Sequence, residues 1–573
     1  MVKLSAFTRL TTNRWRRMAA AADLFPTAEG PASRLMNVRL RGALALALIP
    51  GVAGCAVGPD FFTPAPPVAA KYLEWRNGSI STTKEDYRDW WRVFHDPVLN
   101  RLIDIAYNQN LTLLSAGTQV LQARAQLGIE VGEFYPQQQQ GVGLTNYNRP
   151  SHADAAASPQ ADLSNYWRSA LGASASWQLD FWGKFRRGVE SADAGYLASI
   201  ATYDDVLVTL LGNVASTYIG IRTLEKQIAI ARKNIVRQKE ALQIARDRFN
   251  GGATTEVDVY QAENVLGQTE ASIPRLTTQL RQGENALRVL LGVPPVPLGS
   301  LIGRETGRIP VAPAKIFIGI PADLLRRSPS VRAAELKAAA QSAQIGVAQA
   351  DLYPAISLTG VIGGSAATLN GHNLGQVFTP PGLTYSFGPS LQWNILNYGQ
   401  ITNNVRLQDA TLQQYLVNYQ NSVLTAQQNV ENGIATYLQS KIAVGQLRYS
   451  VRAADGALKL SLLQYQQGTR DYTSVLIAEQ NLLTAENDLA IAEGNGPLGV
   501  TAVYEALGGG WQIREGNGFV PPATNAEMRA RTNWGDVLPP AGTPPPAPPA
   551  LAAPTPGLPG PEDRGPTVRP PAW

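Results

Sequence analysis

The sequence predicts an α+β chain in which one structural unit occurs twice. Each copy of the unit is expected to contain a helix, two strands, a long helix, a tight turn and a second long helix. Three observations lead to this prediction: short motifs recur at a constant spacing, two stretches alternate apolar and polar side chains, and two long segments contain no proline.

The internal duplication is visible in motifs that return at a nearly constant distance. Gln-Leu-Gly-Ile at 126–129 returns as Gln-Ile-Gly-Val at 344–347, an offset of 218 residues. Further along the chain the offset is 216 residues, as for Trp177 and Trp393. A near-constant offset over so long a stretch is the signature of a repeated structural unit.

Each copy contains a stretch with the two-residue period of a β-strand. In 171–181, Leu171, Trp177 and Phe181 belong to an alternating series with small polar residues between them, and 385–395 has the same pattern. A period of two over about 11 residues is typical of a tilted strand that spans a membrane. Partner strands are expected near 140–148 and 356–364, with polar loops at 149–165 and 366–382.

The proline-free segments, 183–248 and 399–467, predict two very long helices. At 1.5 Å per residue each helix would measure roughly 100 Å, which requires packing partners along its whole length. Apolar residues recur at the alternating steps of four and three that keep a seam facing a neighbouring helix. The seams are Leu207, Leu211, Val214, Tyr218 and Ile221 in the first copy and Leu412, Leu416, Tyr419, Val423, Ala426 and Val430 in the second.

Glycines are expected to reverse the chain at the ends of these helices. Gly251 and Gly252 follow the first long helix and Gly468 follows the second, and glycine accepts the positive φ that a tight turn requires. The return helices begin near 255 and 471. We expect Pro274 and Pro497 to kink or break them.

Four spanning strands cannot form a membrane structure alone, because the backbone amides at the open sheet edges would remain unpaired in lipid. Closure into a barrel needs about eight or more strands. Three copies of the chain would supply twelve, and a ring of three copies is our geometric hypothesis for closure.

The N-terminal region has the pattern of an export signal. A basic start with Arg39 and Arg41 precedes a short apolar run, 42–49, which ends at Val-Ala-Gly before Cys55. This order is typical of a secretory signal peptide, and the last residues are similar to the bacterial lipoprotein acylation motif. That similarity implies a lipidated Cys55. The signal can begin at Met36 as well as at Met1.

Composition indicates neither an enzyme nor a nucleic-acid binder. The net charge is only +5 over 573 residues, whereas nucleic-acid binders concentrate Lys and Arg. The three histidines, His95, His152 and His372, lack the spacing of metal ligands. Neither a catalytic triad nor a phosphate-binding loop is present, so we expect no enzymatic activity and no cofactor beyond the lipid.

These features divide the chain into six expected parts. They are an upstream extension and signal peptide (1–54), a lipidated segment (55–97), the first repeat (98–292), a linker (293–320), the second repeat (321–513) and a Pro-rich disordered tail (514–573).

Several motifs together resemble the TolC-like outer-membrane efflux family, in its NodT-type lipoprotein branch. The resemblance implies a homotrimeric exit duct, in which a 12-stranded outer-membrane barrel continues into a long periplasmic helical barrel. Its implied partners are a periplasmic adaptor and an inner-membrane resistance–nodulation–division pump, which supplies the energy. The motifs are 57–61, 90–94, 328–335, 356–360, 388–391 and 506–511.

The resemblance also implies where the duct narrows. The positions that match the periplasmic constriction of the family are Thr473, Ile477 and Gln480. Relatives carry an aspartate where this chain has Ile477, so a hydrophobic constriction, which can gate by dewetting, is the alternative to a ring of carboxylates. The competing function is a lipid-anchored periplasmic coiled-coil protein with a structural or adhesive role.

Overall fold

The computed structural model describes residues 56–538, except 84, 151–163, 304–306 and 370. The predicted signal peptide, Cys55, His152 and the Pro-rich region from 539 onward therefore lie outside the described residues. The described residues belong to one compact unit.

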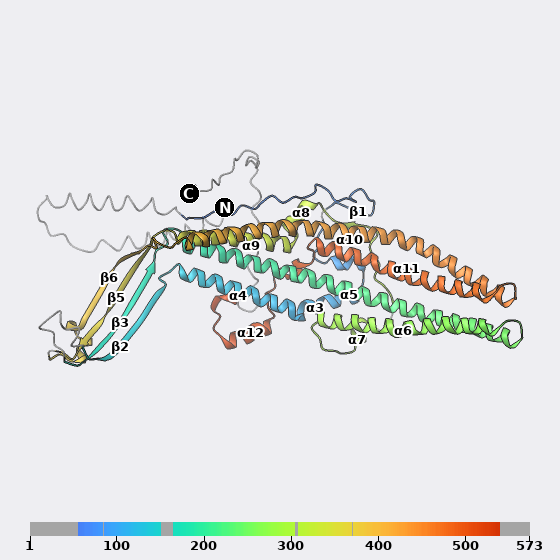
Figure 1. Ribbon diagram of the computed structural model, residues 1–573, viewed down its shortest axis with the longest axis horizontal. Helices are drawn as coiled ribbons and strands as arrows, with labels where there is room; N and C mark the ends of the chain where they lie inside the picture. The colour runs from blue at the N-terminus through green and yellow to red at the C-terminus, as the bar shows by residue number, and fades with distance from the viewer. Residues whose placement is uncertain (1–55, 84, 151–163, 304–306, 370, 539–573) are drawn as a thin grey trace. The chain divides into compact units, whose positions relative to one another are not determined.

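The predicted order of elements occurs twice along the chain (Figure 1). The first copy comprises α4 (Leu111–Glu133), β2 (Gln138–Asn148), β3 (Tyr166–Gln178), α5 (Lys184–Asn250) and α6 (Glu256–Leu290). The second copy comprises α9 (Pro329–Ala350), β5 (Ala355–Ala367), β6 (Leu383–Gln392), α10 (Gln400–Gln466) and α11 (Tyr472–Ala506). The duplicated helix-strand-strand-helix-helix unit is thus confirmed.

Shorter elements lie beside the middle of the long helices. A two-residue parallel pairing joins β1 to β4, and the aromatic side chains of η2 are buried against α11, with Trp90 stacked on Tyr504 at 5.7 Å between ring centroids. These elements are β1 (Ile80–Ser81), η2 (Trp90–Phe94), α3 (Pro97–Gln109), α7 (Gly299–Ile302), β4 (Ile316–Phe317), α8 (Pro321–Arg327) and η6 (Trp511–Arg514).

The four long strands form one antiparallel sheet in the order β2-β3-β5-β6. Both predicted alternating strands end about three residues earlier than expected, at Gln178 and Gln392. In the first copy the reason is Asp180, whose carboxylate accepts the backbone N–H groups of Phe185 and Arg186 at 3.1 and 3.0 Å and thereby begins α5. Hydrogen bonds to the first turn of α5 thus take the place of strand pairing at Asp180.

The long helices have the predicted extent. Helices α5 and α10 contain 67 residues each, or about 100 Å of helix. All five seam residues of the first copy are buried, and of the second seam Tyr419, Val423, Ala426 and Val430 are buried, while Leu412 and Leu416 are half-buried. Among the described helices, only α5 has a stretch long and apolar enough to cross a membrane, and 61% of that stretch is buried in the protein.

Two expectations about proline-containing regions need correction. Pro274 and Pro497 do not break the return helices, because α6 and α11 continue through them. Packing along 35-residue helices outweighs the cost of about 3 kcal/mol for an interior proline. The expected tail also starts later than predicted, because α12 (Pro522–Arg531) and η7 (Gly535–Val537) are folded. Met528 and Leu538 pack against Leu121 of α4, which gives this stretch a small core of its own.

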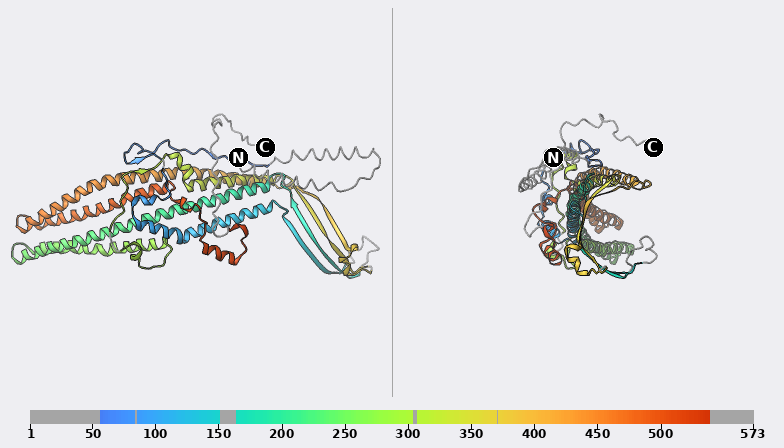
Figure 2. Two further views of the ribbon diagram at one scale, coloured as in Figure 1. Left: turned by 180° about the vertical axis from the view of Figure 1, so that it is seen from behind. Right: turned by 90° about the vertical axis from the view of Figure 1, so that its left-hand side faces the viewer.

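Within this unit the helices and the sheet form one curved layer, which the end-on view in Figure 2 shows most clearly. The strands leave the helices at one end, and the α5–α6 and α10–α11 hairpins extend to the other (Figures 1 and 2). The layer has two free edges, with β2 and α4 on one and β6 and α10 on the other.

Candidate functional site: the hairpin ends and the inner wall

The glycines expected at the hairpin ends lie in the turns between the long helices. Gly252 and Gly468 adopt left-handed φ values of 71° and 73°, and Gly251 follows α5 directly. Each turn joins a 67-residue helix to a 35-residue helix. A side chain with Cβ would be strained at the two left-handed positions.

The three expected constriction residues share one exposed stripe of α11. Thr473, Ile477 and Gln480 are all exposed, and Ile477 is 52% exposed. Their spacing of four and three residues places them on one face of the helix. The opposite stripe, which includes Tyr472 and Glu479, is buried. The structure therefore brings the three residues together, close to the turn at Gly468.

A set of contacts that the sequence did not reveal joins the two hairpin ends. Arg248 of α5 donates to the backbone carbonyls of Tyr465 and Gln466 at the end of α10, the latter at 3.1 Å. The Tyr465 hydroxyl donates to the carboxylate of Asp258 on α6 at 3.0 Å. The Arg248 guanidinium also lies 4.7 Å from the Tyr465 ring centroid. We call these three residues, Arg248, Asp258 and Tyr465, the hairpin lock.

The carboxyl group of Glu479, on α11, is buried near the hairpin lock. Glu479 is 2% exposed, and its Oε2 has no hydrogen-bond partner among the described residues. Burial raises the pKa of Glu479 to about 7. Its counterpart in the first repeat, Glu263, is partly exposed and forms an ion pair with Arg246 at 2.6 Å. The sequence showed the two glutamates as equivalent, and only packing distinguishes them.

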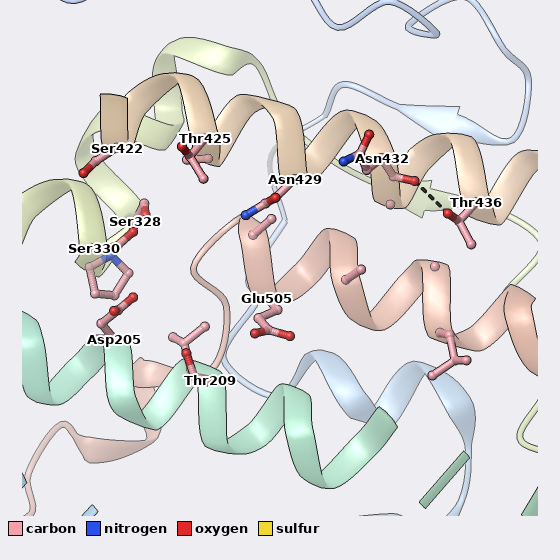
Figure 3. Close-up of a pocket in the computed structure, with 18 of the residues that line it drawn as sticks. Asp205, Thr209, Ser328, Ser330, Ser422, Thr425, Asn429, Asn432, Thr436 and Glu505 are labelled. Atoms are coloured by element: carbon pink, nitrogen blue, oxygen red, sulfur yellow. Dashed lines mark hydrogen bonds between the residues drawn. The ribbon is translucent and has the colours of Figure 1, made fainter. Parts of the chain in front are cut away.

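A polar recess of about 710 Å³ opens where α9 begins and α11 ends. Figure 3 shows its carboxylates, Asp205 of α5 and Glu505 of α11, with hydroxyl and amide side chains of α10 opposite. Burial raises the pKa of both carboxyl groups, that of Glu505 to about 7, with a further increase from the neighbouring charge of Asp205. A Cβ at Gly212 would lie 2.1 Å from Oε2 of Glu505, so the glycine lets this side chain rest on α5.

The recess opens on the side of α10 away from the N-terminal segment. Backbone N–H groups of Ala69 and Leu73 donate to Gln427 and Glu431 at 3.1 and 2.8 Å. Asn429 of the recess lies between these two residues in sequence. A step of two residues rotates a helix by about 200°. The N-terminal segment and the recess therefore lie on opposite faces of the helical layer.

The residues described by the structure offer little for chemistry on a substrate. No group of three or more His, Cys, Asp or Glu side chains among them could hold a metal ion. His95 ends η2 in a left-handed conformation, and His372 lies in a loop before η4 (Leu374–Phe378). The polar groups instead line the recess between α5, α10 and α11 and the hairpin ends.

The sheet differs from that of a water-soluble protein. Along β6, Tyr385, Phe387 and Leu391 are 70%, 84% and 67% exposed on one face. A band of exposed apolar side chains with a period of two is typical of a strand that faces lipid. A curved helical layer that ends in such a sheet defines the class of protein: one part of the wall of a membrane channel.

Comparisons with known proteins identify the family. The model of the outer membrane efflux protein family matches residues 102–293 and 320–509, and the chain belongs to this family. Nodulation protein T of Rhizobium leguminosarum bv. trifolii is 30% identical over 444 residues, which cover 77% of this chain and 91% of the relative. The probable outer membrane lipoprotein SilC of Salmonella typhimurium is 29% identical, with 80% of this chain and 96% of the relative covered.

A solved structure agrees with these relatives. The outer-membrane channel OprN is 30% identical and matches with a TM-score of 0.73, over 80% of this chain and 100% of that one. The predicted resemblance is therefore confirmed. The protein is an outer-membrane channel component of an efflux system, extends into the periplasm and belongs to no enzyme family. This membership decides against the structural or adhesive coiled-coil alternative.

Proposed function

We propose that three copies of this chain form a passive exit duct for small molecules across the periplasm and the outer membrane. The observation that carries this proposal is the curved layer with two free strand edges, β2 and β6. Free edges are not tolerated in lipid, and twelve strands can close a barrel. The helices would continue the barrel into the periplasm, with the polar recess facing the lumen.

The lipid anchor and the partners belong to the same proposal. Lipid on Cys55 would hold the duct to the outer membrane, in line with the name of the lipoprotein SilC. A periplasmic adaptor and an inner-membrane pump of the resistance–nodulation–division type would load the duct and supply the energy. Each copy would contribute two equivalent segments to the wall of the duct. They are the repeats at 98–292 and 321–513, which a linker at 293–320 joins.

We place the constriction at the hairpin ends. Thr473, Ile477 and Gln480 form the exposed stripe nearest the turn at Gly468. Three Ile477 side chains around the threefold axis would make a hydrophobic ring, which can gate by dewetting. The hairpin lock lies at the same end, so separation of the two hairpins would widen the ring.

The internal duplication allows the contact between copies to be worked out. In the first hairpin of the sheet Gly143 lies opposite Leu171, and in the second Gly360 lies opposite Phe387. Leu171 and Phe387 are repeat counterparts, since they are 216 residues apart. Their partners, Gly143 and Gly360, are therefore counterparts as well.

The junction between the two repeats supplies the template. There, Ala175 of β3 lies opposite Gly360 of β5. The counterpart of Ala175 is Leu391 of β6. A pseudo-sixfold ring would thus place Leu391 of one copy opposite Gly143 of the next, with both positions on the lipid face.

A disulfide test follows from this register. Directly opposed residues in antiparallel strands have Cα atoms about 4.5–5.5 Å apart, within reach of a disulfide. We expect the Gly143→Cys/Leu391→Cys double variant to form cross-linked dimers and trimers in oxidised outer-membrane fractions. These trimers should also change mobility on heating.

The matched control is Leu144→Cys with Leu391→Cys, because adjacent strand residues point to opposite faces. It should cross-link weakly, and each single cysteine variant should not cross-link through the sheet. Monomers in every sample, with the chain recovered from outer membranes, would contradict the closed trimeric duct.

A further inference from the structure

The segment that follows Cys55 is held by a buried arginine. The side chain of Arg187, on the first turn of α5, is 7% exposed. Its guanidinium donates to the carbonyls of Val57 and Gly58, both at 3.2 Å, and to the carboxylate of Asp60 at 2.8 Å. One guanidinium thus binds three groups within four consecutive residues. The fourth bond, 2.7 Å to Glu190, fixes the orientation of the guanidinium within α5.

The opposite wall of this site is built of glycine. A Cβ at Gly346 of α9 would lie 2.7 Å from the carbonyl oxygen of Val57 and 2.8 Å from Cγ of Arg187. Gly58 has a left-handed φ of 97°, and a Cβ there would lie 2.4 Å from Cα of Gly346. Backbone therefore packs directly on backbone, and no side chain larger than hydrogen fits at either glycine.

The repeats show that this site is specific to the N-terminal segment. The counterpart of Gly346 in the first repeat is Gly128, and a Cβ there would meet no atom within 4 Å. The counterpart of Arg187 is Asn403. Its amide is shorter and cannot donate the same set of hydrogen bonds as a guanidinium. Gly128 lies on α4 at a free edge of the layer, whereas Gly346 lies on α9 inside it, so within one chain only Gly346 packs against the N-terminal segment.

The site adjoins the base of the sheet. The backbone N–H of Val57 donates to the carbonyl of Trp182 at 3.0 Å. The Trp182 indole stacks on Tyr353 at 4.7 Å and donates to the carbonyl of Pro354 at 2.8 Å. Strand β5 begins at the next residue, Ala355. The held segment is thereby tied to the point where the helices become strands.

We propose that Arg187 and Gly346 form a receptor for residues 57–60 that sets where the lipid anchor enters the membrane. The proposal rests on the proposed lipidation of Cys55. Two residues of chain reach at most about 7 Å, so a lipid attached two residues before Val57 is restricted to the base of the sheet. Arg187 acts as a positioning residue: it aligns the acyl chains with the lipid boundary of the strands.

Hydrogen exchange of the full-length chain, purified in detergent after export, tests the receptor directly. We expect the Val57 amide, which donates to the carbonyl of Trp182, to exchange at least tenfold faster in Arg187→Gln and in Gly346→Ala than in the parent. Gly346→Ala changes no charge and approaches the site from the other wall, so it keeps the test valid if Arg187→Gln folds poorly. Unchanged exchange in both variants would overturn the proposal.

Two matched controls separate this effect from a general loss of stability. Arg186→Gln removes the adjacent arginine, whose described side-chain hydrogen bonds all go to Asp180, at 3.0 and 3.1 Å, and not to residues 57–60. Gly128→Ala makes the same change as Gly346→Ala at the open counterpart. Both controls should exchange as the parent does. Accelerated exchange in the controls would show that the effect comes from a general loss of stability, and it would overturn the proposal.

The positioning role of Arg187 is tested by the yield of oligomers when the parent and the variant carry the same amount of lipid. Labelling with radioactive palmitate should be the same in the parent and in Arg187→Gln, while the heat-modifiable trimer bands fall severalfold in the variant only. Equal oligomer yield in a variant that has lost its exchange protection would overturn the positioning role. Absence of label in the parent would contradict the proposed lipid anchor, whereas the exchange result would still decide whether the receptor exists.

Discussion

At the scale of single residues, packing gives two equivalent glutamates different properties. Glu479 and Glu263 follow alanine at the same place in the two repeats. Helix α11 lies between α10 and α5 and buries Glu479, whereas α6 packs mainly on α5 and leaves Glu263 partly exposed beside Arg246. Periodicity identified the helical face of each residue but could not show how many neighbours cover that face.

The buried carboxyl group predicts a pH-dependent stability of the hairpin end. The pKa of Glu479 is raised from 4.5 to about 7, so the native state retains a proton that the unfolded chain releases between these values. Stability should be greatest below about pH 4.5 and decrease as pH rises through the window to pH 7. The loss amounts to roughly 3 kcal/mol.

Thermal unfolding followed by helical circular dichroism between pH 5 and 8 measures this contribution. Glu479→Gln keeps the shape without the titration, and we expect its melting temperature to depend less on pH than that of the parent. Glu263→Gln is the control and should retain the pH dependence of the parent. An identical pH dependence in Glu479→Gln and the parent would contradict the assignment.

At the scale of elements, the long helices and strands were predictable because each depends on a local pattern. Absence of proline and a regular apolar seam define α5 and α10, and alternation defines β3 and β6. Elements whose stability comes from distant contacts were not predictable. Helix α12 is stabilised because Met528 and Leu538 pack against Leu121, which lies about four hundred residues earlier in the chain.

Among the contacts between helices, the hairpin lock leads to the clearest prediction for the exchange of amide hydrogens. Tyr465→Phe removes one hydrogen bond to the Asp258 carboxylate, a loss of about 1.5–3 kcal/mol for a bond to a charged group. We expect the turn segments near 250–258 and 465–472 to exchange amide hydrogens faster in this variant. Tyr449→Phe, at a site 67% exposed on the same helix, should exchange as the parent does. Equal exchange in Tyr465→Phe and the parent would show that the lock does not hold the hairpins.

At the scale of the whole molecule, the resemblance indicated three positions for the proposed constriction but not the environment around them. The matching motif located Thr473, Ile477 and Gln480, and the structure sets them on one exposed stripe. The hairpin lock, the burial of Glu479 and the polar recess depend on side chains from several helices. A single sequence does not show which helices are neighbours, so these features required the structure.

The central claim is that the chain forms a duct that narrows at Ile477. Single-channel conductance of the purified trimer in planar bilayers tests it most directly, with the parent compared to Ile477→Gly. Ile491→Gly makes the same substitution at a 43% exposed site farther along the same helix and controls for the helix-weakening effect of glycine, about 1 kcal/mol. We predict a small, mostly closed conductance in the parent and in Ile491→Gly, and a larger one in Ile477→Gly. No conductance from any of the three, with trimers present, would contradict the duct.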